Sequence, residues 1–290
     1  MNKLEANVSL FIITFFAAIQ YAFLSGVPES VSHFAFLCIT NLIGFLIVLA
    51  MFFNELFRLD SKLVKQSALL SAELFGFNIF ILLGARGLDA TVTACVLSSY
   101  FVFVPFFAYL CFKQKPDKNS IVGIAIVLIG LFFMMNCNVH GLLKINILYL
   151  IIADIFFAIY ILTAGHFTAG SNPSILALGQ LYFSFIFALA CWTVEMLCKN
   201  QTLTFPKSPA FWGSVIFISF FIRSLYSVVQ IYAQRYVSAL NTSLIFSTEI
   251  IMTMAATPVL TKLFDMPAAE GNITVFRIIG AIVMVIGILA

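Results

Sequence analysis

Runs of apolar residues, repeated along the whole chain, set the first constraint on the fold. A helix needs about 20 apolar residues to cross the hydrocarbon core of a bilayer. The connectors between the runs are short and rich in Gly, Pro, Asn and Ser, which are typical of turns. The sequence therefore predicts an all-α integral membrane protein with ten transmembrane helices in a lipid bilayer, approximately at 7–24, 32–56, 67–85, 90–112, 119–137, 145–165, 174–198, 210–234, 239–262 and 273–290.

The composition supports this prediction and excludes several kinds of function. Hydrophobic residues make up 62% of the 290 residues and charged residues only 9%, whereas soluble domains carry about 25% charged residues. No basic patch suggests a nucleic-acid partner. The six cysteines lie in or at the ends of apolar runs without a CxxC pair, which indicates small buried side chains and neither disulfides nor metal ligands. We expect no cofactor and no metal.

An even number of spans places both termini on the same side of the membrane. The side of the termini carries eight Lys and Arg residues and the opposite side carries six, and the excess comes from the early connectors. Because cytoplasmic connectors carry an excess of Lys and Arg, we expect a multi-pass protein of the cell (inner) membrane with both termini in the cytoplasm.

The two halves of the chain resemble each other. At a displacement of 149 positions, Ser98, Ser99 and Tyr100 fall on Ser247, Thr248 and Glu249, and the same displacement matches Arg86, Ala90, Thr93 and Val96 to Arg235, Ala239, Thr242 and Ile245. At a displacement of 157, Gly123 and Gly130 fall on Gly280 and Gly287.

These matches predict one repeat over 1–138 and a second over 139–290, each with five spans. An odd number of spans makes the second copy enter the membrane from the opposite side, which gives an inverted repeat. In such proteins the substrate site lies near the middle of the membrane and alternating access is the usual mechanism.

Two stretches resemble the EamA-type members of the drug/metabolite transporter superfamily. The first is YAQRYVSALNTSLIFSTEII, in which a helix ends in an Ala-Gln pair and the next span carries a Glu in its first half. The second is SSYFVFVPFFAYLCFKQKPDKNSIVGIAIVLIGL, with a Pro in the fourth span (Pro105) and a Gly pair in the fifth. The chain differs from the family pattern in having Ile250 after the ninth-span Glu and Phe112-Lys113 at the end of the fourth span. The resemblance implies a membrane transporter of ten spans in two repeats.

Four charged residues interrupt the apolar runs near their middle: Arg223, Glu249, Asp154 and Glu73. Each charge costs on the order of 2.5–3.5 kcal/mol to insert at the centre of a membrane helix, so such residues pair, face a polar cavity or mark a transport pathway. Arg223 suits the bidentate capture of a carboxylate or phosphate, and its alternative role is a permanent structural ion pair. A lone buried carboxyl group tends to be neutral, which makes a coupled proton a candidate partner.

Polar neighbours extend this candidate site. At a period of 3.6 residues, Arg223, Tyr226, Gln230 and Gln234 form one stripe of a helix, although Gln230 and Gln234 could equally serve as hydrogen-bonding contacts between helices. Asn241 lies on a face similar to that of Glu249, and Tyr100 occupies the position equivalent to Glu249 in the first repeat. The substrate-binding or coupling residues that we predict are Arg223, Glu249, Asp154, Tyr100, Gln230, Glu73 and Asn241.

These features predict a secondary transporter of a small polar organic metabolite, amino-acid-like or zwitterionic, which works by alternating access. ATP is not expected to drive it because the chain has no phosphate-binding loop motif. A nucleotide-linked metabolite exchanger of the same superfamily is the alternative. An intramembrane enzyme is disfavoured, because HExxH and GxSxG are absent and no His lies in the middle of a span. A structural membrane protein would have no use for three acids within the membrane.

Overall fold

The computed structural model describes residues 1–24, 27–28, 30–58, 60–84, 93, 96–113, 118–134, 145–199, 205–264 and 274–289. Within these ranges every regular element is a helix, as the apolar runs predict. In the described part of the chain, six helices are long and apolar enough to cross a membrane: 3–20, 33–58, 145–170, 173–199, 209–233 and 239–256. Three further apolar helices are shorter, at Tyr100–Cys111, Ile121–Phe133 and Val275–Gly287. The count of ten spans therefore stays a prediction.

The chain divides into two compact units, and each unit takes segments from both halves of the sequence. The first unit comprises Met1–Phe75 and Thr163–Val237, and the second comprises Gly76–Leu162 and Ser238–Ala290. Two long helices, α3 (Ser61–Gly84) and α7 (Ile145–Gly170), contribute to both units. The two units are defined by contacts in space, whereas the repeats expected over 1–138 and 139–290 are defined by matching sequence positions. The division into units therefore does not test the repeats, which stay a prediction.

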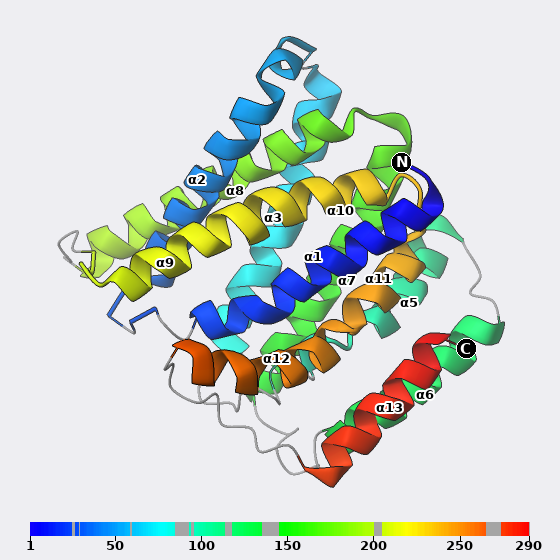
Figure 1. Ribbon diagram of the computed structural model, residues 1–290. Coiled ribbons are helices and arrows are strands. Elements are labelled where there is room, and N and C mark those ends of the chain that lie inside the picture. Colours follow the sequence, from blue (N-terminus) through cyan, green and yellow to red (C-terminus); the bar gives the residue numbers. More distant parts are fainter. Residues whose placement is uncertain are drawn as a thin grey trace. The chain divides into compact units, whose positions relative to one another are not determined.

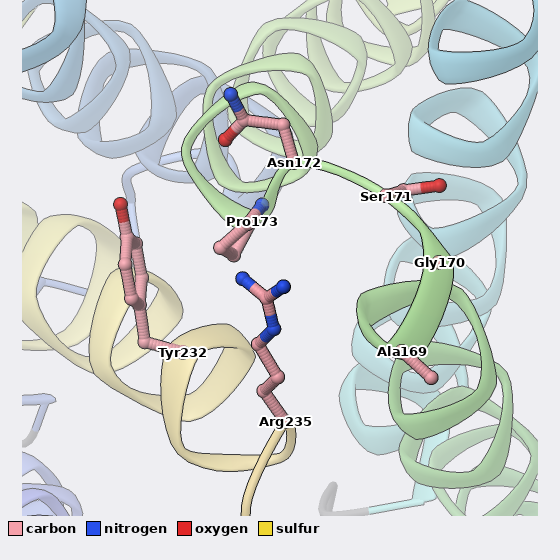
Figure 2. Close-up of a pocket in the computed structure, with 7 residues that line it drawn as sticks. All are labelled: Ala169, Gly170, Ser171, Asn172, Pro173, Tyr232 and Arg235. Carbon is pink, nitrogen blue, oxygen red and sulfur yellow. The ribbon is translucent and has the colours of Figure 1, made fainter.

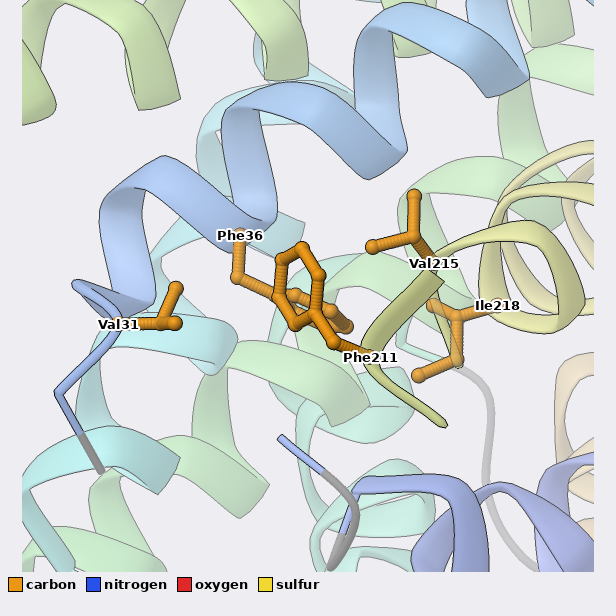
Figure 3. Packing of buried hydrophobic residues seen from close by; sticks show 5 residues of the cluster. All are labelled: Val31, Phe36, Phe211, Val215 and Ile218. Carbon is orange, nitrogen blue, oxygen red and sulfur yellow. The ribbon is translucent and has the colours of Figure 1, made fainter. Parts of the chain in front are cut away.

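The first unit is built around two adjacent helices, α2 (His33–Phe52) and α8 (Pro173–Lys199), which lie side by side (Figure 1). Besides its parts of α3 and α7, it contains α1 (Lys3–Leu24), η1 (Phe53–Arg58) and an uninterrupted helical segment formed by α9 (Pro209–Phe217), η3 (Ile218–Tyr226) and α10 (Ser227–Ala233). Where α2 meets α9, the rings of Phe36 and Phe211 lie 6.3 Å apart between centroids. Figure 3 shows these rings with Val31, Val215 and Ile218, all of them buried.

The connectors of the first unit gather at its two ends according to their expected side of the membrane. At one end, hydrogen bonds join Asn172 to Glu55 (2.9 Å), Ser171 to Gln66 (2.8 Å) and Ser174 to Tyr232 (2.5 Å). At the other end, hydrogen bonds join Ser32 to Glu195 and Ser214 to the Phe23 carbonyl (2.7 Å). The helices of this unit thus alternate in direction, as a chain that crosses a membrane repeatedly must do.

In the second unit, α6 (Lys118–Met134) and α13 (Val275–Leu289) lie side by side along their lengths (Figure 1). A Cβ added at Gly123 would lie 2.6 Å from the Gly287 carbonyl oxygen, and one added at Gly130 would lie 2.8 Å from that of Gly280. The early residue of one helix contacts the late residue of the other, so the pair is antiparallel. In the sequence match, Gly123 corresponds to Gly280 and Gly130 to Gly287. Exchanging the two helices therefore converts the Gly123–Gly287 contact into the Gly280–Gly130 contact, which is also present. A two-fold axis perpendicular to both helices has this property.

Two further spans of the second unit are interrupted at equivalent positions. The sequence predicts unbroken helices over 90–112 and 239–262, but turns at Ser98–Ser99 and Thr248 precede α5 (Tyr100–Phe112) and α12 (Glu249–Phe264), and α11 (Ala239–Ser247) ends before the second turn. The Thr248 carbonyl accepts a backbone bond from Met252 N (3.1 Å) at the usual spacing of four residues. In addition, each turn has one backbone hydrogen bond that enters it and one that leaves it with a spacing of three residues. These are Ser99 N to Val96 O (2.8 Å) and Val102 N to Ser99 O (3.0 Å), and Thr248 N to Ile245 O (3.1 Å) and Ile251 N to Thr248 O (3.1 Å).

The residues that form the two bonds at the second turn lie 149 positions after those that form the two bonds at the first turn. Each bond closes over three residues instead of four, so the backbone groups at the interruption stay satisfied without water, as a membrane interior requires. Two other positions of the sequence match, Arg86 and Ala90, lie outside the described residues.

The close glycine contacts between α6 and α13 can be tested by adding one methyl group. We expect Gly123→Ala to lower the unfolding temperature in detergent, because the new Cβ would meet a backbone carbonyl, and overpacking costs about 1–3 kcal/mol. Replacing Gly by Ala in an open helix should instead gain up to about 1 kcal/mol of helix propensity. The matched control is Gly213→Ala, since nothing lies within 4 Å of a Cβ at that position. If the two variants unfold at the same temperature, the contact is wrong.

Candidate functional site

Asp154, on α7 in the second unit, is a fully buried acid. Its side chain is 0% exposed. Oδ2 accepts a hydrogen bond from the Ser99 hydroxyl at 2.6 Å, and Oδ1 is buried with no hydrogen-bond partner among the described residues. The interruption before α5 explains this bond: Ser99 is the N-cap of α5 but does not cap that helix with its side chain, so its hydroxyl is available to α7. The carboxyl group is therefore held by one oxygen, and the other oxygen can accept a proton or a donor.

Tyr100 lies next to this group. Its side chain is 4% exposed, and its ring packs edge-on against Phe157, with centroids 4.8 Å apart and an interplanar angle of 82°. Phe157 follows Asp154 by three residues, which places both on one face of α7. Ser99 and Tyr100 thus contact α7 at successive turns. The sequence predicted Tyr100 as a site residue from its equivalence to Glu249 alone.

Glu249 and Asn241, in the same unit, occupy different surroundings. Glu249 is partly buried and is the first residue of α12, where the partial positive charge of a helix N-terminus favours a carboxylate. Asn241 is exposed in the first turn of α11, and its N–H bonds to the Ser238 hydroxyl at 3.3 Å. These two residues are separated by more than two helical turns and the turn at Thr248.

Glu73, on α3 in the first unit, repeats the pattern of Asp154. The side chain is 8% exposed, and Oε1 accepts a hydrogen bond from the Thr163 hydroxyl at 3.1 Å. Oε2 is buried with no hydrogen-bond partner among the described residues. Two acids of the apolar spans, one in each unit, are therefore half-satisfied by a single hydroxyl.

Arg223 lies in a segment whose helix type was predicted wrongly from the sequence. A helix with a regular 3.6-residue period was predicted over 210–234, but Ile218–Tyr226 forms a π-helix. Arg223 is partly buried, and its Nε is fully buried with no hydrogen-bond partner in the described part of the chain. Gln230 and Gln234, beyond the π-helix, are 1% and 4% exposed. The single stripe from Arg223 to Gln234 is therefore not continuous, because the wider π turns change the direction in which residue 223 points relative to residue 230.

The predicted residues separate into two groups. The first unit holds Glu73, Arg223 and Gln230, and the second holds Asp154, Tyr100, Glu249 and Asn241. The expectation that Arg223 and Glu249 line one cavity stays a prediction. The ion pairs found among the described residues lie near helix ends, as in Arg58–Glu55 (3.3 Å) and Lys199–Glu195 (2.5 Å). Arg223 is absent from these pairs, so nothing in the described part of the chain makes it the permanent structural partner of an acid.

Several features of the site were not predicted. Gly44 of α2 lies against Arg223, and its carbonyl accepts a hydrogen bond from Ser224 within the π-helix. Nothing in the apolar pattern distinguishes Gly44 and Ser224 from other small residues. Thr93 and Thr242, which the repeat matches to each other, are 8% and 0% exposed, and neither hydroxyl has a hydrogen-bond partner among the described residues. Among those residues, no group of three or more His, Cys, Asp and Glu could hold a metal ion.

A separate pocket of about 550 Å³ lies at one end of the first unit. It is lined by the connection between α7 and α8 and by the end of α10, through Ala169, Gly170, Ser171, Asn172, Pro173, Tyr232 and Arg235. Figure 2 shows the Arg235 guanidinium group pointing toward Pro173 beside the Tyr232 ring. Arg235 is exposed. Because the pocket lies at helix ends, it is distinct from the charged groups within the spans.

Comparisons with known proteins agree with this description. Residues 5–136 match the EamA-like transporter family. An uncharacterized transporter of Archaeoglobus fulgidus is 23% identical over 251 residues, which cover 86% of this chain and 76% of that protein. The uncharacterized transporter YyaM of Bacillus subtilis is 21% identical over 222 residues, 74% of this chain and 68% of that protein.

A protein of known crystal structure has the same fold. It superimposes with a TM-score of 0.70 at 13% sequence identity, over 99% of this chain and 94% of its own. At this level of identity the likeness concerns the fold alone. The first half of the chain therefore carries an EamA-like transporter domain, and the chain is similar over most of its length to transporters of the EamA type, in the drug/metabolite transporter superfamily.

Proposed function

We propose that this protein is a secondary transporter of a small polar organic metabolite with both an ammonium and a carboxylate group, such as an amino acid. The observation that carries the proposal is the set of charged side chains within the apolar spans. Arg223, Asp154 and Glu73 each have one buried polar atom without a hydrogen-bond partner in the described part of the chain. Substrate groups of opposite charge would satisfy these atoms.

The chemistry of these side chains favours a zwitterion. Charged groups within a membrane are costly and are retained where they bind or conduct something. A guanidinium group binds a carboxylate through two parallel hydrogen bonds, and a carboxylate accepts hydrogen bonds from an ammonium group. Glu249, Tyr100, Gln230 and Asn241 are the further candidate contacts. A site near the middle of the membrane that holds both kinds of charge would select substrates that carry both.

The mechanism that we propose is alternating access by an inverted repeat of two five-helix halves. The exchangeable glycine contacts of α6 with α13, and the equivalent turns before Tyr100 and Glu249, support this proposal. Proteins of this architecture expose a site near the midplane to each side of the membrane in turn. We place the protein in the cell membrane with both termini in the cytoplasm, on the basis of the Lys and Arg bias of the early connectors.

Ligand binding by the purified protein tests the substrate class. We expect a zwitterionic amino acid to raise the unfolding temperature of the wild-type protein, since a ligand at 100 times its Kd stabilises the native state by about 2.7 kcal/mol. The corresponding amine without a carboxylate should stabilise much less. Arg223→Lys should weaken binding because Lys cannot make the bidentate contact. The matched control is the same change at the exposed Arg235, which should bind normally.

If a screen of amino acids stabilises neither the wild-type protein nor the Arg235→Lys control, the proposed substrate class is wrong. Equal stabilisation of the Arg223→Lys variant and the wild type would show that Arg223 does not contact the substrate.

A proton is the coupling ion that we propose, with Asp154 as its carrier, because one carboxyl oxygen is bonded to Ser99 and the other is without a partner among the described residues. In proteoliposomes, an imposed pH gradient should drive accumulation by the wild-type protein. Asp154→Asn keeps the size of the side chain but cannot release a proton, so its accumulation should not respond to the gradient. The control is Glu5→Gln, at an exposed acid of the N-terminal turn. Accumulation by Asp154→Asn that still follows the gradient would exclude Asp154 as the carrier.

A further inference from the structure

We propose that Gly44 and Ser224 are positioning residues for Arg223. Helix α2 holds the segment around Arg223 in its π-helical form through these two residues, and this form sets the direction of the guanidinium group. The inference rests on the proposed function only in giving Arg223 a substrate to bind. The geometry that carries it lies entirely within the first unit.

The π-helix is the first observation. Long π-helical segments are rare, and π turns within α-helices occur frequently at functional sites. Here nine residues, Ile218–Tyr226, are π-helical between two α-helices, and Arg223 lies among them. The Ser224 hydroxyl donates to the carbonyl of Ser219, five residues earlier, at 2.8 Å. Five residues is also the spacing of the backbone hydrogen bond of a π-helix, so this side chain stabilises the wider turn.

The second observation is the approach of α2. The Ser224 hydroxyl also lies 3.3 Å from the Gly44 carbonyl oxygen, which links the π-helix to α2 across 180 residues of sequence. A Cβ added at Gly44 would lie 2.6 Å from Arg223 Cβ and 3.4 Å from the Ser219 carbonyl oxygen. Real Cβ atoms do not approach another carbon this closely. Only glycine at position 44 therefore lets residue 223 take its present place.

The opposite side of the segment packs against α1. The rings of Phe16 and Phe221 stack with centroids 4.5 Å apart, and those of Phe23 and Phe217 stack at 3.9 Å. The π-helix is thus packed between α1 and α2, and the Phe16–Phe221 stack opposes its movement away from α2. An extra methyl group at position 44 has to displace Arg223 itself.

The π-helix changes the direction in which the Arg223 side chain points. In a regular α-helix, residues 223 and 230 would lie on one face, since seven residues make nearly two turns. The π turns between them rotate Arg223 away from the face of the helix on which residue 230 lies. Gly44 and Ser224 maintain this rotation, so their replacement should change the direction of Arg223 while its charge is kept.

The test follows Arg223 directly, without needing a substrate. The purified variants are treated with an arginine-specific dicarbonyl reagent, and peptide mass spectrometry measures the modification rate at Arg223 and, as an internal standard, at the exposed Arg235. We expect Gly44→Ala and Ser224→Ala to change the Arg223 rate severalfold and to leave the Arg235 rate unchanged. The matched controls are Gly213→Ala, where a Cβ meets nothing within 4 Å, and Ser243→Ala, whose hydroxyl bonds to the Leu240 carbonyl of its own helix. Both controls should give the wild-type rate.

A second measurement, amino-acid binding, tests whether the direction of Arg223 affects the affinity for the substrate. The two test variants should bind the zwitterionic amino acid found for the wild type about tenfold more weakly, which is about 1.4 kcal/mol, and the controls should bind it normally. Ser224→Ala adds no volume, so it decides the question if Gly44→Ala does not fold. An unchanged Arg223 modification rate in the folded test variants would overturn the inference. If no amino acid binds the wild type, the proposed function fails, but the modification rates still decide whether Gly44 and Ser224 position Arg223.

Discussion

The cost of holding a charged or polar group inside an apolar helix is the constraint on which the rest of this structure depends. Within a membrane no water can satisfy such a group, so the protein itself must do so. Single hydroxyls serve this purpose for the two buried acids, Ser99 for Asp154 and Thr163 for Glu73. In each case the second carboxyl oxygen is left without a partner in the described part of the chain, and we propose that a substrate group or a proton satisfies it.

Departures from regular helix occur next to the same polar groups. The turn at Ser98–Ser99 frees the hydroxyl that reaches Asp154, the turn at Thr248 makes Glu249 the first residue of a new helix, and the π-helix carries Arg223. Each departure keeps its backbone groups bonded through shorter or longer hydrogen-bond spacings. The irregular geometry of these spans thus coincides with the residues that the proposed mechanism uses.

The sequence predicts the helical fold, because apolar runs leave a strong pattern. The glycines at 123, 130, 280 and 287 were matched between the two halves of the sequence, but the contacts that they make between α6 and α13 were not predicted. The π-helix could not be predicted in this way, because it depends on a contact with Gly44 that is 180 residues distant from Ser224. The turns before Tyr100 and Glu249 were also missed, since a Ser or Thr within an apolar run fits an unbroken helix equally well. Which of the predicted site residues meet around a substrate stays a prediction.

Counterflow in proteoliposomes tests the central claim, secondary transport by alternating access, most directly. Vesicles that contain the purified protein are loaded with an unlabelled zwitterionic substrate and diluted into a trace of the labelled form without ATP. An alternating-access carrier exchanges the two forms, so the account predicts transient accumulation of label inside the vesicles above its external concentration. Label that only equilibrates, at a rate that does not depend on internal substrate, would indicate a pore and contradict the account.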